Sequence, residues 1–363
     1  MGQQTDARTE VAVAVLGAGQ AGLSSAYFLR RFGFTAGDDF VVLDADDAAG
    51  GAWQHRARSL TMHKVHGIFS LPGMAFQPSS AADGRPVADV VPEYFAAYER
   101  RFELPVRRPV RVHSVRDEGR LVVATDAGEW STRAVINSTG TWRRPHWPYY
   151  PGVAEFAGRQ LHYADYTGPD EFAGLRVAVI GGGHSATHVL SEVSTTAASV
   201  HWFTRRPPAF RDDEFTLDEG RNAVALVEER VRAGLPPQSV VSITGLPYTT
   251  VVRDALAGGA LDRLPMFARV TETGVAWTNG RQLPVDVIVW CTGFRAALDH
   301  LAPLRLREHG GGIKLDGIRV VADSRVHLVG YGPSASTIGA NRAGRTAARE
   351  VRDLLTIADT AAA

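Results

Sequence analysis

Two glycine-rich turns constrain the fold of this 363-residue chain more than any other feature. The first turn, Gly-Ala-Gly-Gln-Ala-Gly at 17–22, follows a continuous apolar run at 11–16 and precedes a helix-like stretch at 23–31. A run that is apolar throughout is typical of a strand buried on both faces of a parallel sheet. A second such strand at 40–43 ends at Asp44. The order strand, glycine turn, helix, strand predicts the opening unit of a dinucleotide-binding fold.

The same unit returns later in the chain. An apolar strand at 177–180 is followed by Gly-Gly-Gly-His-Ser-Ala at 181–186, by a helix to Val193 and by another strand at 200–203. A single glycine motif often occurs by chance, but two motifs that each have a strand before them and a helix after them are much rarer. The chain is therefore predicted to be an α/β protein with two dinucleotide-binding, Rossmann-like domains.

A repeated ending indicates the domain boundaries. Each unit is followed by a predicted hairpin, a buried strand and a Thr-Gly turn. The hairpins lie at 110–125 and 267–283, the strands at 134–138 and 285–290, and the turns at Thr139-Gly140 and Thr292-Gly293. We predict a discontinuous first dinucleotide-binding domain, residues 1–150 plus 292–363. Residues 151–291 are predicted to form the second dinucleotide-binding domain, inserted into the first.

The residues of the first turn each have a part in binding a pyrophosphate. Gly17 permits the tight turn, Gly19 lets the backbone approach the phosphates and Gly22 allows close packing of helix on strand. Gln20 and Ala21 begin the helix, whose first N–H groups and positive dipole end favour an anion. We therefore predict that all five residues bind cofactor.

The residue at the end of the second strand indicates whether the cofactor bound at this turn has a phosphorylated or an unphosphorylated adenosine ribose. Asp44 stands where a carboxylate accepts hydrogen bonds from both ribose hydroxyls, which implies an unphosphorylated adenosine as in FAD or NAD. The alternative is a solvated turn acid, since Asp46 and Asp47 are close in sequence.

The second turn follows the same form. Gly181, Gly183 and Ala186 occupy the places of the three small residues, and His184 and Ser185 lie within the turn, where a pyrophosphate would sit.

The second unit differs at the end of its second strand, where Thr204, Arg205 and Arg206 replace the acid. Arginine binds a 2′-phosphate through charge-assisted hydrogen bonds, so NADP(H) is predicted here. The alternative is a surface arginine pair that precedes Pro207-Pro208.

Charge balance and cysteine count exclude several classes of protein. Basic and acidic residues number 39 each, so no net charge attracts the chain to nucleic acid or to an anionic membrane. The single cysteine, Cys291, excludes an internal disulfide, a Cys-x-x-Cys redox pair and a thiolate zinc site. His184 and His188 lack the glutamate of a zinc protease, so no metal is predicted. No secretory signal and no apolar run of about 20 residues is visible, which favours a cytoplasmic protein.

One further segment carries a family resemblance. Residues 156–166 read Phe-Ala-Gly-Arg-Gln-Leu-His-Tyr-Ala-Asp-Tyr and match F-x-G-x-x-x-H-x-x-x-[YF], the fingerprint that lies between the two glycine turns of class B flavoprotein monooxygenases. The chain resembles this family over nearly its whole length, and it looks most like the short bacterial ArsO-like flavoproteins. Further matches to the family are Gly50-Gly51-Ala52-Trp53, Thr139-Gly140-Thr141-Trp142 and Thr292-Gly293-Phe294. The segments that look most like the ArsO-like subgroup are Gly51–His55, Trp290–Phe294 and Val329–Gly332.

The resemblance implies cofactors and a reaction. It implies an FAD-dependent monooxygenase that uses NADPH and O2 to oxygenate a small molecule, at S, N or As or at a ketone, through a C4a-(hydro)peroxyflavin. Such chemistry belongs to the cofactor and needs no protein nucleophile. The additional cofactor-binding residues that it implies are Gly51, Trp53, Thr139, Gly140, Thr292, Gly293 and Tyr331.

Three histidines are the candidate catalytic residues. His162 belongs to the fingerprint and either positions the nicotinamide or packs the joint between the domains. His63 and His66 lie in a Gly/Pro-rich stretch expected near the flavin, and ordinary loop hydrogen bonding is the alternative for both. Many eukaryotic-type members carry a catalytic asparagine in the segment that corresponds to 59–66, and this sequence has none there.

Two other functions stay open at this point. One is an NADPH oxidase or flavin reductase that transfers no oxygen, and the other is a non-catalytic nucleotide-binding module that senses redox state. The sequence identifies neither the substrate nor the oligomeric state, because pocket residues in such folds come from loops without a readable motif.

Overall fold

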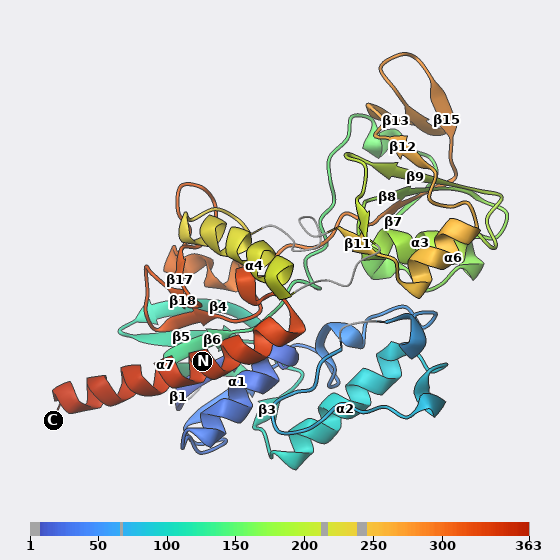
Figure 1. Ribbon diagram of the computed structural model, residues 1–363. Helices are drawn as coiled ribbons and strands as arrows, with labels where there is room; N and C mark the ends of the chain where they lie inside the picture. Colours follow the sequence, from blue (N-terminus) through green and yellow to red (C-terminus); the bar gives the residue numbers. More distant parts are fainter. Residues whose placement is uncertain (1–7, 66–67, 212–216, 238–244, 363) are drawn as a thin grey trace, which may run out of the picture.

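The computed structural model describes residues 8–65, 68–211, 217–237 and 245–362, which form two α/β units, each built on its own sheet (Figure 1). The first sheet has the order β17-β18-β19-β6-β1-β2-β3, and β19, β6, β1, β2 and β3 run parallel. β4 and β5 form an antiparallel hairpin that extends from β6. Its strands are β1 (Thr9–Leu16), β2 (Phe40–Leu43), β3 (Val106–Arg107), β4 (Val112–Glu118), β5 (Arg120–Thr125), β6 (Gly128–Asn137), β17 (Leu315–Asp316), β18 (Arg319–Val320) and β19 (Val326–Leu328).

The register of this sheet gathers the predicted binding residues at one edge. Leu16, the last residue of β1, pairs with Leu43 of β2 and with Asn137 of β6. The residues that follow these strand ends, Gly17 and Asp44 among them, therefore leave the sheet side by side. This edge is where ligands bind in open parallel sheets.

Three long helices cover or flank the first sheet, namely α1 (Gln20–Arg31), α2 (Val87–Arg101) and α7 (Thr337–Ala362). α1 and α7 lie close together. Glycine at position 344 permits this approach, since a β-carbon there would stand only 2.8 Å from Ser24 Oγ. Val13 and Val15 of β1, Leu23 of α1 and Ala347 of α7 share one buried core. The chain end after the predicted insertion therefore completes the first unit.

The second sheet is parallel throughout, in the order β12-β9-β8-β16-β7. The helices α3 (His184–Val193) and α6 (Thr250–Ala257) contribute to its buried core. The strands are β7 (Arg159–His162), β8 (Arg176–Ile180), β9 (Ser199–Thr204), β12 (Arg263–Pro265) and β16 (Val287–Trp290), and a separate short pair is β10 (Phe210–Arg211) with β11 (Leu246–Pro247). The fold class predicted from the two glycine turns is confirmed.

The segment predicted as a second hairpin is a three-stranded antiparallel sheet instead. β13 (Arg269–Thr271), β14 (Gly274–Ala276) and β15 (Gln282–Pro284) follow one another in order. The predicted Asn279-Gly280 turn joins β14 to β15, and an additional turn precedes Gly274. A β-carbon on Gly274 would stand 2.1 Å from the Leu283 carbonyl oxygen, so glycine lets the two strands approach here.

The two units repeat one detail of their glycine turns. A β-carbon on Gly17 would lie 2.7 Å from the carbonyl oxygen of Ser138, the residue after β6. A β-carbon on Gly181 would lie 2.1 Å from the carbonyl oxygen of Cys291, the residue after β16. The first glycine of each turn is therefore pressed against the end of the matching neighbour strand.

One helix of the predicted insertion packs on the other unit. α4 (Leu217–Arg232) lies beside β17 and β18 in Figure 1, and its Val231 shares a buried core with Leu298 and Tyr331. The limits 1–150 plus 292–363 and 151–291 remain a prediction. Among the helices of the described ranges, none combines the length and apolar character that crossing a bilayer requires.

Candidate functional site

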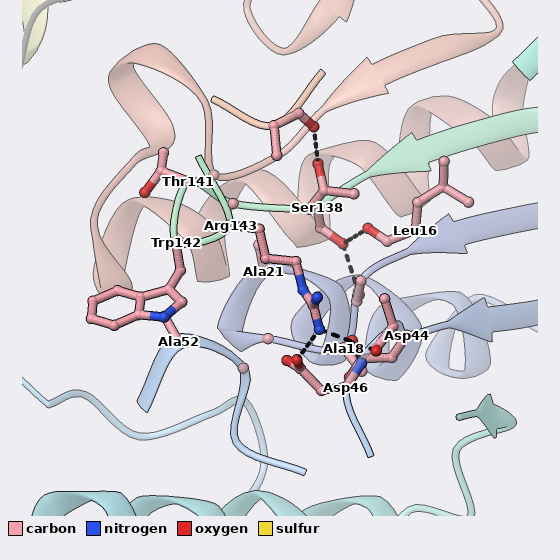
Figure 2. A pocket seen from close by; sticks show the side chains of 18 of the residues that line it. Leu16, Ala18, Ala21, Asp44, Asp46, Ala52, Ser138, Thr141, Trp142 and Arg143 are labelled. Atoms are coloured by element: carbon pink, nitrogen blue, oxygen red, sulfur yellow. Dashed lines mark hydrogen bonds and ion pairs between the residues drawn. The ribbon is translucent and has the colours of Figure 1, made fainter. Parts of the chain in front are cut away.

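A cavity of about 970 Å³ lies at the edge of the first sheet where β1, β2 and β6 end (Figure 2). Its volume is at the upper end of the range of about 300–1,000 Å³ for ligand pockets, which suits a dinucleotide. Most residues predicted to bind the first cofactor line it together: Gly17, Gly19, Gln20, Ala21, Asp44, Gly51, Trp53, Thr139 and Gly140.

The three glycines of the first turn have different reasons to be glycine. Gly17 has a φ of +96°, and a β-carbon on Gly22 would stand 1.8 Å from the Gly17 carbonyl oxygen. The protein itself therefore requires glycine at both positions. A β-carbon on Gly19 would meet nothing closer than the Gly51 α-carbon at 3.9 Å. Gly19 thus leaves open space beside the backbone, as a bound pyrophosphate needs.

Asp44 is a buried carboxylate and not a solvated turn acid, since only 6% of its surface is exposed. Arg108 donates from Nη2 to Asp44 Oδ2 at 3.0 Å and from Nη1 to Glu99 Oε2 at 2.7 Å. Burial raises the pKa of the Asp44 carboxyl, and the Arg108 guanidinium opposes that shift. Sequence reasoning missed Arg108, because no motif connects it to Asp44 across the intervening chain.

The carboxylate of Asp46, the second acid of this loop, is bound by other side chains of the protein. It accepts hydrogen bonds from Gln54 Nε2 at 3.1 Å and lies 3.0 Å from His55 Nε2. Arg143, which also lines the cavity, forms an ion pair with it, as Figure 2 shows. These contacts join the loop after β2 to the loop after β6.

Two tryptophans of the cavity wall enclose an arginine. The Arg56 guanidinium lies 4.4 Å from the centre of the Trp142 ring and 5.5 Å from that of Trp53. Burial lowers the pKa of Arg56. A cation between two aromatic rings is stabilised by cation–π attraction. No spacing in the sequence marks Arg56, although both tryptophans belong to segments that match the family.

A neutral histidine also lines the cavity. His300 Nε2 lies 2.6 Å from Asn137 Oδ1, and Thr139 Oγ1 donates to the Ala297 carbonyl at 2.7 Å. Burial lowers the pKa of His300 to about 4. These contacts fix the Thr139-Gly140 turn against residues 297–300.

The second glycine turn has the same construction. Gly181 has a φ of +142° and abuts Cys291, whereas a β-carbon on Gly183 would meet nothing within 4 Å. The turn leads directly into α3, whose first residues are His184, Ser185 and Ala186. As in the first unit, one glycine is required by the protein and another leaves space for a ligand.

The basic residues after β9 lie at the surface. Arg205 and Arg206 are exposed, and Thr204 is buried. Thr204 Oγ1 donates to the Arg206 carbonyl at 2.7 Å and accepts from Arg263 Nε at 2.6 Å. Arg263 was missed by sequence reasoning, since it reaches Thr204 only because β12 pairs with β9.

His162 lies at the joint between the units and outside the cavity. Its Nδ1 accepts from the Ala164 N–H at 3.1 Å, so Nε2 carries the proton and donates to the Gly293 carbonyl at 3.1 Å. Thr292 Oγ1 donates to the His146 carbonyl in the same region. Burial lowers the pKa of His162. Both ring nitrogens are engaged by backbone, which favours the packing interpretation of His162 and places Thr292-Gly293 at the joint.

Two other predicted residues, His63 and Tyr331, are not among the residues that line the cavity. His63 is exposed, with Nδ1 3.0 Å from Thr61 Oγ1 and 3.1 Å from the Asp83 carbonyl. His66 lies outside the described residues. Tyr331 is buried in the core with Val231, because an aromatic ring gains more from that apolar contact than from the polar edge.

Comparisons with known proteins agree with this geometry. The family model of pyridine nucleotide-disulphide oxidoreductases matches residues 14–220. The structure of a flavin-containing monooxygenase from Stenotrophomonas maltophilia is 40% identical, covers 96% of this chain and 99% of that chain, and has a TM-score of 0.81. An uncharacterized CzcO-like oxidoreductase from Geobacillus kaustophilus is 29% identical over 83% of this chain and 85% of its own length. The indole-3-pyruvate monooxygenase YUCCA1 of Oryza sativa is 25% identical over 85% of this chain and 81% of its own length.

Proposed function

Because the chain belongs to the pyridine nucleotide-disulphide oxidoreductase family and to the class B flavin monooxygenase superfamily, we propose that FAD occupies the cavity of the first unit and NADP(H) the second glycine turn. The protein is an NADPH-dependent flavin monooxygenase that oxygenates a small molecule with O2. The proposal concerns which residues perform this function and on which class of substrate.

One observation carries the assignment of the two cofactors. Both units present a glycine turn and a helix N-terminus, but the ends of their second strands have opposite charge. Asp44 accepts hydrogen bonds from a ribose with free hydroxyls, whereas Arg205 and Arg206 attract a 2′-phosphate. The buried position of Asp44 and the exposed positions of the two arginines fit these partners.

The residues of the first cavity fit FAD in particular. Gly19 leaves space for the pyrophosphate, and the first N–H groups of α1 point toward the same place. When bound there, FAD would supply the redox chemistry, namely acceptance of a hydride from NADPH and activation of O2. Trp53 and Trp142 supply apolar wall, which reduces access of water to the cavity.

The single cysteine distinguishes this chain from a disulphide reductase of related architecture. Cys291 is buried after β16, and burial raises the pKa of its thiol. One cysteine cannot form the redox pair that such a reductase needs. The chain therefore lacks the redox disulphide that would accept electrons from the flavin in such a reductase.

For the substrate we propose a small molecule with a soft heteroatom (S, N or As) or a ketone, oxidised in the cytoplasm. The support is the resemblance of the Gly51–His55, Trp290–Phe294 and Val329–Gly332 segments to the short bacterial ArsO-like flavoproteins. The balanced net charge gives no reason to expect nucleic acid or a membrane surface as a partner.

The test is an oxygen balance on the purified protein. Flavin absorbance is recorded first, and then NADPH consumption, peroxide release and incorporation of oxygen-18 from labelled O2 are measured over sulfides, amines, arsenicals and ketones. The Gly19→Ala variant serves as the control, because it is expected to fold and to bind FAD more weakly. Labelled product from one class would identify the substrate class.

Two other outcomes would contradict the proposal. Peroxide release equal to NADPH consumption, with no response to any compound, would make the protein an NADPH oxidase or flavin reductase. A folded, colourless protein that takes up no added FAD and oxidises no NADPH would make it a nucleotide-binding module.

A further inference from the structure

A buried carboxylate lies where the two units meet. Glu192, near the end of α3, is only 7% exposed. Its Oε2 accepts hydrogen bonds from Ser59 Oγ at 2.7 Å and from the Tyr166 hydroxyl at 2.8 Å. Its Oε1 lies 2.8 Å from Lys64 Nζ and 3.2 Å from His188 Nε2.

These partners come from three separate parts of the chain. Ser59 and Lys64 belong to the segment that follows Trp53, which lines the first cavity. Tyr166 is the last residue of the fingerprint segment. His188 belongs to α3 itself, the helix that begins at the second glycine turn. Glu192 therefore connects the wall of the first cavity to the helix that begins at the second turn.

The contacts use most of the capacity of this carboxylate. An ionised carboxylate accepts about four hydrogen bonds. Glu192 accepts three, from Ser59, Tyr166 and Lys64, and His188 Nε2 lies 3.2 Å from Oε1 as an ion-pair contact. Burial alone would raise its pKa, but His188, Lys64 and Ser59 outweigh burial and hold the pKa of Glu192 well below its usual range. Moving the two units apart would separate Glu192 from Lys64 and leave a buried charge uncompensated, which is strongly unfavourable. The ion pair therefore stabilises the present arrangement of the units.

We propose that Glu192 is a positioning residue that holds the second glycine turn at the distance from the first cavity that hydride transfer requires. This inference rests on the proposed function, since it assumes that a nicotinamide in the second unit reduces a flavin in the first. Glu192 touches neither cofactor turn directly and acts through α3 and the segment 59–64. The rate of hydride transfer depends steeply on this geometry, since a displacement of about 1 Å can cost about 100-fold.

The first test compares Glu192→Gln with Glu171→Gln. A glutamine offers one acceptor oxygen and an amide that only donates, so at least one of the three hydrogen-bond donors to Glu192 loses its acceptor. Glu171 is the matched control, because its partners Arg159 and Thr167 both lie in the second unit. Rapid mixing with NADPH without O2 gives the rate of flavin reduction at saturation. We expect Glu192→Gln to lower this rate about 10- to 100-fold, with flavin content unchanged and Glu171→Gln equal to wild type.

Two further readouts report position without turnover. The long-wavelength absorption of a nicotinamide stacked on reduced flavin is expected to weaken in Glu192→Gln. Small-angle X-ray scattering of the purified holoprotein is expected to show a larger radius of gyration and a broader distance distribution for Glu192→Gln and for Lys64→Met than for Glu171→Gln. Lys64→Met removes the cation from the other side of the joint and provides the test if Glu192→Gln does not fold.

The outcomes separate this inference from the proposed function. Wild-type reduction kinetics together with a wild-type scattering curve in Glu192→Gln would overturn the positioning role. If the wild-type flavin is not reduced by NADPH, the proposed function fails. In that case the scattering curves alone decide whether Glu192 holds the two units together.

Discussion

Arg108 donates from Nη2 to Oδ2 of Asp44 at 3.0 Å, and the same guanidinium is bound by Glu99 of α2. All three side chains are at least 87% buried, so the ion pairs are little screened by solvent. Arg108, which follows β3, thus fixes the position of the Asp44 carboxylate that is proposed to bind the FAD ribose.

Arg108→Ala is expected to destabilise the protein and to weaken FAD binding. Removing the guanidinium leaves Asp44 and Glu99 buried without a cation, which costs about 3–5 kcal/mol. Urea unfolding measures the stability, and titration of the apoprotein with FAD measures the affinity. The exposed Arg100 of α2 is the control, and Arg100→Ala should leave both unchanged. Wild-type stability in Arg108→Ala would show that the buried carboxylates do not need this partner.

Alanine at Gly22 and at Gly19 should have different consequences. A β-carbon on Gly22 would stand 1.8 Å from the Gly17 carbonyl, so Gly22→Ala is expected to prevent folding of the first unit or to lower its stability severely. Gly19→Ala has 3.9 Å of space and should fold, with FAD affinity reduced about tenfold or more, equal to about 1.4 kcal/mol. Circular dichroism and flavin content measure both effects. Equal stability of the two variants would contradict the prediction.

Arg205 and Arg206 are predicted to select NADPH over NADH. Their replacement by alanine removes charge-assisted hydrogen bonds worth about 1.5–3 kcal/mol each, so KM for NADPH should rise about tenfold or more per residue. KM for NADH should stay unchanged, because NADH carries no 2′-phosphate. Initial rates with both coenzymes measure the effect, and the exposed Arg253 of α6 provides a control. An unchanged ratio of the two KM values would mean that these side chains are not the selectors.

The low pKa of His300 predicts a loss of stability in acid. Burial lowers this pKa to about 4 in the folded protein from the ordinary 6.5. Between pH 6.5 and 4, His300 is protonated in the unfolded chain but stays neutral in the folded protein. The free energy of unfolding therefore falls as the pH falls through this window. The side chain of His300→Gln can still donate to Asn137 but does not titrate. This variant should reduce the slope of the free energy of unfolding against pH by up to about 1.4 kcal/mol per pH unit, the value for one proton.

Urea unfolding from pH 4 to 7.5 measures the slope for wild type and His300→Gln. His162, His146 and His201 also have lowered pKa values and remain in both proteins, so their contributions cancel. The exposed His309 gives a matched control, His309→Gln. Identical slopes in wild type and His300→Gln would contradict the prediction.

The parts of the fold that were predictable follow from local pattern. Continuous apolar runs identified β1, β2, β8 and β9, since buried parallel strands have no polar face. The glycine turns then placed Asp44 and Thr204 at the ends of neighbouring strands. The two Thr-Gly turns also have equivalent positions in the two units. The residue before each of them, Ser138 or Cys291, lies against the first glycine of the glycine-rich turn, Gly17 or Gly181.

The remaining features depend on contacts between distant segments. Arg108 reaches Asp44, and Arg263 reaches Thr204, only because the sheets bring their strands together. Tyr331 follows a predicted binding strand, yet its ring turns into the core against α4. The contacts of Glu192 were not predictable either. Tyr166 belongs to the fingerprint segment, but no pattern in the sequence connects it, Ser59 or Lys64 to Glu192.

The order of segments also determines when each unit becomes complete on the ribosome. β19 and α7 follow the five-stranded sheet in the chain, yet β19 pairs with β6 and α7 packs on α1. The five-stranded sheet emerges in full while the larger sheet still lacks its final parallel strand and residues 329–340 of the cavity wall. A nascent chain therefore cannot complete the first sheet until the segment after the inserted unit has been made. A chain truncated before Val326 would keep the second glycine turn but would lack β19 and part of the cavity wall.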